Sequence, residues 1–186
     1  LVEEWLSTNN PKLLDRLKEV LTNRVGAWNE LIRQYMDRGA YEEMLTLGQY
    51  TPDSLMIDYY CAYAAHQLMQ KDIKYSEEEK RWLDLAHRST IDYCYPNNED
   101  DVVVLHYVIQ VGAELYKPYY LLALYYYGND NRQEGARFAQ MAVNANPYMR
   151  EAHRLLAIAL MDVFQDKKGA LNEIEKSFNI EKTPRG

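Results

Sequence analysis

Histidine and cysteine are the side chains that most often bind metals or act as nucleophiles, and this chain has few of either. It contains four histidines and two cysteines in 186 residues. No histidine lies three or four residues from another histidine or from a cysteine, as zinc ligands on one helix would. The histidines are His66, His87, His106 and His153. We therefore expect no metal site and no cofactor.

Carboxylates are numerous, but their spacing does not suit catalysis. Adjacent acidic residues occur at Glu3–Glu4, Glu42–Glu43, Glu77–Glu79 and Asp100–Asp101. Most begin an expected helix, where the partial positive charge of the helix N-terminus favours them. Sequence neighbours point about 100° apart on a helix and make poor acid–base pairs. Nucleophile, phosphate-loop and metalloprotease motifs are absent from the sequence, so it predicts a protein that is not an enzyme.

Charge and composition argue against two classes of partner. The net charge is −7 and no basic run is present, which argues against nucleic acid. No stretch approaches the roughly 18 apolar residues that a membrane helix requires. Cys61 and Cys94 have neither CxxC nor metal-ligand spacing. We expect both to be small buried thiols in apolar helices, as in a cytoplasmic protein in a reducing compartment.

The elements that must position any site are repeated between Pro118 and Pro184. Tyr119, Leu122, Ala123 and Tyr126 are followed 34 residues later by His153, Leu156, Ala157 and Leu160. Gly135, Ala139 and Ala142 are followed 35 residues later by Ala170, Ile174 and Ser177. This period, with large and small residues at fixed offsets, is typical of a helix–turn–helix repeat. The sequence predicts an all-α protein of about ten helices, an α-solenoid of antiparallel helix pairs.

Local signals predict several helix boundaries. Ser76 and Glu79 have the spacing of a capping box, and the helix that they begin is expected to end before Pro96, with Tyr93 on its apolar face. Asn98 precedes an acidic first turn. Asn146–Pro147 has the cap-then-proline pattern of a helix start, and residues 181–186 read as a loose polar tail.

The repeat resembles the tetratricopeptide (TPR) family, because Trp28, Leu31, Tyr35 and Gly39 match that family's large residues and its glycine. The resemblance implies a right-handed superhelix and a single repeat domain over residues 1–186. Its units fall near residues 11–50, 54–96, 98–147 and 148–180.

Ligands of such arrays commonly lie on the concave face, which the first helix of each pair lines. The resemblance places ten residues of this chain there: Asn29, Arg33, Asp58, His66, Tyr120, Leu124, Tyr127, Arg154, Ile158 and Met161. Tyr, Arg and Met are frequent in interface hot spots and inside flexible binding surfaces. Our leading hypothesis is a non-catalytic scaffold that binds a peptide or a neighbouring domain there. Alternatively, Tyr120 and Tyr127 only pack against the adjacent helix.

A narrower resemblance links the chain to the TPR region of bacterial proteins that carry an uncharacterised N-terminal β-sandwich domain. It depends on Asp92–Pro96, on Pro118–Tyr127 and on His153–Ala159. It implies a second hypothesis, in which the chain is the C-terminal accessory region of a larger, carbohydrate-active enzyme whose other domain is its partner. The chain opens with Leu1 rather than Met, which fits a piece of a longer protein.

Self-association as a homo-oligomer, through the exposed end of the array, is a third hypothesis. The last helix, Ala170 to Ile180, argues against it, because its polar side chains resemble those of a capping helix. These side chains are Asn172, Glu173, Glu175 and Lys176.

Overall fold

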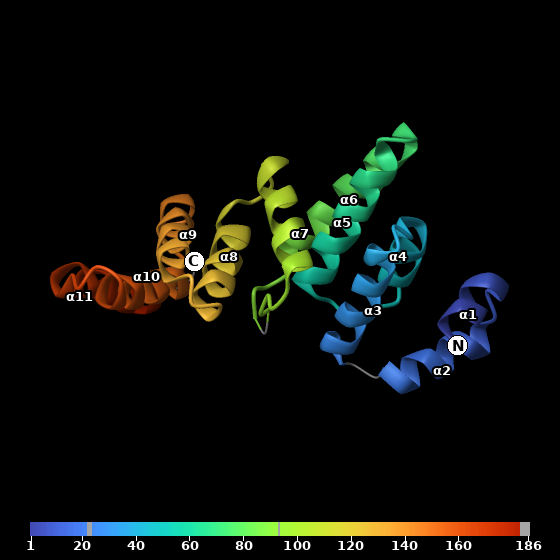
Figure 1. Cartoon of the computed structure of the whole chain (residues 1–186), viewed down its shortest axis with the longest axis horizontal. Coiled ribbons are helices and arrows are strands. Elements are labelled where there is room, and N and C mark those ends of the chain that lie inside the picture. Colours follow the sequence, from blue (N-terminus) through green and yellow to red (C-terminus); the bar gives the residue numbers. More distant parts are fainter. Residues whose placement is uncertain (22–23, 93, 183–186) are drawn as a thin grey trace. The chain divides into compact units, whose positions relative to one another are not determined.

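The computed structural model describes residues 1–21, 24–92 and 94–182, and the regular secondary structure of this part of the chain is helical. It contains eleven α-helices, one 3-10 turn and no strand (Figure 1). The all-α prediction is therefore confirmed. The chain divides into two compact units, Leu1–Thr90 and Ile91–Gly186. The predicted polar tail beyond residue 182 lies outside the described residues.

Unit 1 consists of helices that pack in consecutive pairs. Its elements are α1 (Val2–Thr8), α2 (Pro11–Leu21), α3 (Val25–Asp37), α4 (Tyr41–Gly48), α5 (Leu55–Met69), the 3-10 turn η1 (Ile73–Tyr75) and α6 (Ser76–Arg88). Helix α3 packs on α4, α4 on α5, and α5 on α6. Trp28, Ile32, Met44 and Tyr60 are fully buried between them. Gly48 lets α4 lie close to α5, since a Cβ there would clash with Cys61 Sγ.

Unit 2 repeats one helical hairpin after an initial helix. It consists of α7 (Glu99–Gln110), α8 (Tyr116–Gly128), α9 (Arg132–Ala145), α10 (Arg150–Asp162) and α11 (Lys167–Lys182). Each helix packs on the next along the chain. The short connections make α8–α9 and α10–α11 antiparallel pairs. Leu122 and Leu156, which the repeat predicts at equivalent places, are both buried on the first helix of a pair.

Two of the predicted helix starts differ from the structure. Ser76 is not an N-cap, because η1 leads directly into α6 and Ser76 already has helical φ −62° and ψ −36°. Helix α10 begins at Arg150 rather than at Pro147. A turn intervenes, in which Asn146 Oδ1 accepts a hydrogen bond from the Tyr148 N–H at 3.0 Å. The expected start at Asn98 is confirmed by a complete capping box with Asp101.

Helix α6 ends at Arg88, well before the predicted end near Pro96. Ser89 leaves the helix with ψ 142°, and its hydroxyl donates to buried Asp58 Oδ2 at 2.6 Å. A contact 31 residues away in the sequence thus accompanies the end of this helix. Cys61 and Cys94 are both buried, as expected, but Cys94 lies outside any helix. Tyr93 lies outside the described residues.

Candidate binding surface

In unit 1, three of the four predicted concave-face residues are engaged with their own neighbours. Asp58 on α5 is buried and accepts the Ser89 hydrogen bond, so it offers no exposed carboxylate. Arg33 on α3 pairs with Glu30 one turn earlier. His66 Nδ1 on α5 lies 2.9 Å from Glu79 Oε1 on α6. Asn29 on α3 is partly buried, and its Oδ1 has no hydrogen-bond partner among the described residues.

In unit 2, the predicted residues lie on α8 and α10. Tyr120, Leu124 and Tyr127 come from α8 and are partly buried. Arg154, Ile158 and Met161 come from α10. Ile158 is 48% exposed and Met161 37%, so these two are the most open of the six. Large apolar side chains left open on a folded surface often mark a binding site.

The tyrosines of α8 contribute mainly to packing and to one polar link. Burial, helped by Glu151 and Tyr95, raises the pKa of Tyr120 to about 12. The Tyr127 hydroxyl donates to Asp162 Oδ2 at 2.5 Å and so links α8 to the end of α10. Burial first, and this hydrogen bond second, raise the pKa of Tyr127 to about 12. Both phenols therefore remain protonated at neutral pH.

An apolar pocket of about 460 Å³ lies between α10 and α11, and we call it the terminal groove. It is lined by Ala157, Ile158, Met161, Asp162, Lys167, Ala170, Leu171 and Ile174. Ile158 and Met161 were predicted as site residues, whereas the α11 residues were not. The signal that could have found them is the spacing of Leu171, Ile174 and Phe178 along one side of α11.

Helix α11 does not present the predicted polar cap. Leu171 is 65% exposed and Phe178 is 51% exposed, while Glu173 is buried. The acidic and amide residues that suggested a cap therefore do not form one continuous outer face. The apolar stripe of Leu171, Ile174 and Phe178, which we call the α11 stripe, continues from the terminal groove along the helix.

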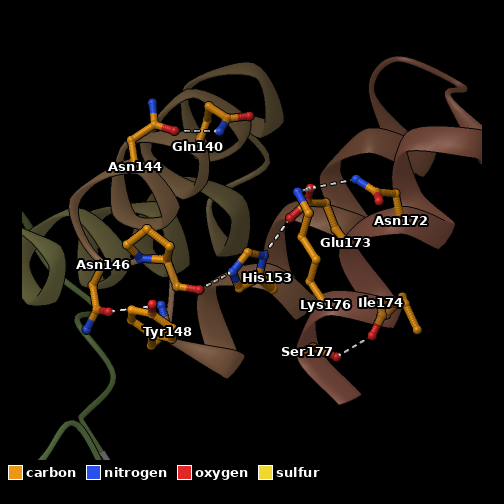
Figure 2. Close-up of polar contacts among 11 residues, drawn as sticks. Gln140, Asn144, Asn146, Tyr148, His153, Asn172, Glu173, Ile174, Lys176 and Ser177 are labelled. Carbon is orange, nitrogen blue, oxygen red and sulfur yellow. Dashed lines mark hydrogen bonds and ion pairs between the residues drawn. The ribbon is translucent and has the colours of Figure 1, made fainter. Parts of the chain in front are cut away.

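The two walls of the terminal groove are joined by a buried polar network (Figure 2). His153 Nδ1 on α10 lies 2.5 Å from Glu173 Oε2 on α11, and His153 Nε2 lies 2.8 Å from the Pro147 carbonyl oxygen. Lys176 Nζ donates to the other Glu173 oxygen at 2.6 Å. The expected interior position of His153 is confirmed.

Hydrogen-bond chemistry determines the protonation of this network. Burial opposes ionisation of Glu173, but the hydrogen bonds from Lys176 and His153 outweigh it and lower the pKa of Glu173 below its usual 4.5. A carboxylate and a carbonyl oxygen can only accept, so both ring nitrogens of His153 donate when the two bonds are made. The network therefore fixes α10 on α11 and has no nucleophile to activate.

Neither a metal centre nor a membrane span is found in the described part of the chain. No three His, Cys, Asp or Glu side chains gather there to hold a metal ion. Among the described helices, none combines the length and the apolar character needed to cross a bilayer.

Comparisons with known proteins give structural likeness alone. No family model matches the chain, and neither does any curated protein. "MamA 41-end from Desulfovibrio magneticus RS-1" has a TM-score of 0.45 at 18% identity, with 100% of this chain and 93% of that chain covered. "MamA RS-1 ArsTM double mutant" has a TM-score of 0.44 at 19% identity, with 97% of this chain and 90% of that chain covered. "Crystal structure of MamA" has a TM-score of 0.43 at 14% identity, with 90% of this chain and 84% of that chain covered. Likeness at this level carries no argument about function.

Proposed function

We propose that this protein is a non-catalytic interaction module that binds a protein segment through α8, α10 and the terminal groove of unit 2. The observation that supports the proposal is the terminal groove itself, which is apolar and open and is lined by two of the predicted site residues. The TPR-like superhelix and the repeat units assigned from the sequence belong to the same proposal.

The distribution of exposed apolar side chains supports this site. Ile158 and Met161 on α10, Phe164 in the following loop, and Leu171 and Phe178 on α11 are all exposed. Soluble proteins rarely leave apolar side chains gathered in this way unless another surface covers them. Methionine and aromatic side chains are also enriched at protein interfaces.

The experiment replaces the two most open predicted residues. We expect Ile158→Glu with Met161→Glu to reduce capture of binding proteins from the source cell's lysate at least tenfold. The matched control, Gln133→Glu with Gln140→Glu, adds the same charge at exposed positions of α9 and should leave capture unchanged. Circular dichroism checks that both variants keep the helical content of the wild type. Equal capture by both variants would refute the site.

Tyr120, Tyr127 and Arg154 remain part of the proposed surface, but they make a poorer first test. Tyr127 is hydrogen-bonded to Asp162 across α8 and α10, so its removal changes helix packing as well as any binding. Tyr120 is partly buried, and the same reservation applies. The Ile158 and Met161 substitutions separate binding from folding more cleanly.

The alternative function, an accessory region of a larger carbohydrate-active enzyme, depends on the narrower resemblance of Asp92–Pro96, Pro118–Tyr127 and His153–Ala159. In that case the partner of the proposed surface is another domain of the same polypeptide. Reading the gene upstream of the Leu1 codon tests it. A start codon close to that position excludes the alternative, and an upstream segment with strand-like alternation supports it.

A further inference from the structure

The two helix pairs of unit 2 differ in what covers the second helix. Ala136 and Val143 on α9 are 2% and 8% exposed. Thirty-five residues later the repeat places Leu171 and Phe178, which are 65% and 51% exposed. Equivalent positions of one repeat are therefore buried in the first pair and open in the second.

The reason is that α9 has two neighbours where α11 has one. Helix α9 packs on α8 and also on α10, the first helix of the next pair. Helix α11 packs on α10, and no other described helix of unit 2 makes a comparable contact with it. The face that α10 occupies on the α8–α9 pair is therefore open on the α10–α11 pair, where the terminal groove and the α11 stripe lie.

We propose that the terminal groove and the α11 stripe bind an amphipathic α-helix, which stacks on α10–α11 as α10 stacks on α8–α9. This inference rests on the proposed function, because it specifies the partner of the same surface. The surface continues a packing arrangement that the chain already makes once, and in that arrangement the occupant is a helix. An occupant of this kind fits the groove by apolar residues at i, i+3 or i+4, and i+7.

The shape of the surface favours a helix over a small ligand. A pocket of about 460 Å³ is large enough for a small molecule. However, the apolar surface does not end at the pocket, because Phe178 extends it along α11. The eight residues from Leu171 to Phe178 span about two turns, roughly 10 Å of helix axis. Only Asp162 and Lys167 bring charge to the lining, so few polar groups could orient a small ligand.

The repeat position shared by Tyr127 and Met161 indicates one side chain that the bound helix should carry. Tyr127 on α8 donates a hydrogen bond to Asp162 on α10. In the next pair, the repeat places Met161 where α8 has Tyr127, and a thioether cannot donate a hydrogen bond. The bound helix therefore needs no acidic residue where α10 has Asp162, and an apolar residue fits better there.

The probe is a synthetic peptide with the sequence of residues 148–163, because α10 fills the equivalent groove in this structure. Its Asp162 position is replaced by Leu. A lactam bridge between the Arg154 and Ile158 positions holds it helical, and circular dichroism confirms the helix. Binding of the fluorescein-labelled peptide to the full chain is followed by anisotropy.

We expect saturable binding, with the affinity lowered at least tenfold by Leu171→Lys with Phe178→Lys. The matched control, Asn172→Lys with Asn179→Lys, adds the same charge with the same spacing on another face of α11 and should bind as the wild type does. A second probe that keeps Asp at the 162 position should bind more weakly than the Leu probe.

Three results overturn the inference. The first is a helical probe that does not bind, and the second is equal loss of binding in both Lys variants. The third is a sedimentation experiment in which the chain dimerises and the Leu171→Lys, Phe178→Lys variant does not, which would assign the surface to a second copy. If the probe fails but the Ile158 and Met161 substitutions still abolish capture, the proposed function stands and only the helical occupant is wrong.

Discussion

The helix pairs α8–α9 and α10–α11 follow one pattern, yet they are held together by different chemistry. In the first pair, the Tyr119 ring on α8 lies 6.3 Å from the Phe138 ring on α9. The equivalent residues of the second pair, 34 and 35 residues later in the sequence, are His153 and Glu173. These two form the buried hydrogen bond between α10 and α11. An aromatic contact has thus been replaced by a charged one at the same place in the fold.

This difference shows that the repeat specifies where two helices meet but not which interaction joins them. Phe138 also stacks on Tyr126, with the rings 5.5 Å apart and nearly parallel, so α8–α9 is joined by apolar area. In α10–α11, the equivalent contact depends on a carboxylate that must remain ionised and paired. The two pairs should therefore respond differently to substitution and to pH.

The largest effect is expected from breaking the charged contact. We predict that Glu173→Ala lowers the free energy of unfolding by about 3–5 kcal/mol, because it leaves the His153 ring buried without its acceptor. Urea denaturation followed by circular dichroism measures it.

The control for this prediction copies the first pair into the second. His153→Tyr with Glu173→Phe recreates the Tyr119 and Phe138 positions, and should recover most of the lost stability, since buried ion pairs can often be replaced by apolar residues. A cost below about 1 kcal/mol for Glu173→Ala would contradict a structural role for the pair.

A smaller loss of stability is expected at a repeat position where the first pair has glycine and the second pair has alanine. A Cβ at Gly135 would lie 3.0 Å from the Tyr127 backbone nitrogen, whereas the equivalent residue of the second pair is Ala170. Overpacking costs about 1–3 kcal/mol, and alanine regains up to about 1 kcal/mol through helix propensity. We therefore predict that Gly135→Ala lowers the free energy of unfolding by about 1–2 kcal/mol in thermal or urea melts.

Gly128 provides the control for that substitution. It also lies in unit 2, but a Cβ there would meet no atom within 4 Å. Gly128→Ala should leave the stability unchanged or raise it slightly. If both variants behave alike, the close approach of α9 to Tyr127 has no energetic consequence.

The pH dependence of the unfolding free energy distinguishes the α10–α11 pair from the α8–α9 pair without replacing an apolar residue. The pKa of Glu173 is lowered in the folded chain, so its contribution to stability is complete above its ordinary value of 4.5. The contribution is lost as pH falls through the lower, folded pKa. We predict that the difference in unfolding free energy between the wild type and Glu173→Gln shrinks as the pH falls below about 4.5. A difference that stays constant down to pH 3 would show that folding does not lower the pKa of Glu173.

The sequence predicted those features that depend on spacing along one helix. Leu122 and Leu156 could be assigned to the interior because large and small residues recur at fixed offsets, and this pattern is local. The end of α6 could not be predicted in this way, because Ser89 is held by Asp58, a residue far away in the chain. Similarly, a polar α11 suggested a cap, since only the packing shows that Glu173 is turned inward to His153.

Of the terminal groove, only residues of the α10 wall were predicted from the sequence. Ile158 and Met161 occupy positions that the TPR resemblance assigns to a binding face, and both line the terminal groove. Their role in binding stays a prediction. The other wall of the terminal groove comes from α11, and Leu171 is open because no described helix of unit 2 follows α11 in the stack. The sequence pattern cannot show that this position is open, since the equivalent residue of the first pair, Ala136, is buried.

The smallest effect is expected on the open face of α11, and it tests the comparison most directly. We predict that Leu171→Lys with Phe178→Lys changes the free energy of unfolding by less than about 0.5 kcal/mol, because both side chains are already largely in water. At the equivalent position of the covered pair, Ala136→Lys should destabilise the chain by several kcal/mol, since it places a charge beneath α10. Urea melts of the two variants provide the measurement. A large loss for the α11 variant would mean that Leu171 and Phe178 support the fold, and that face could then no longer be regarded as free for a partner.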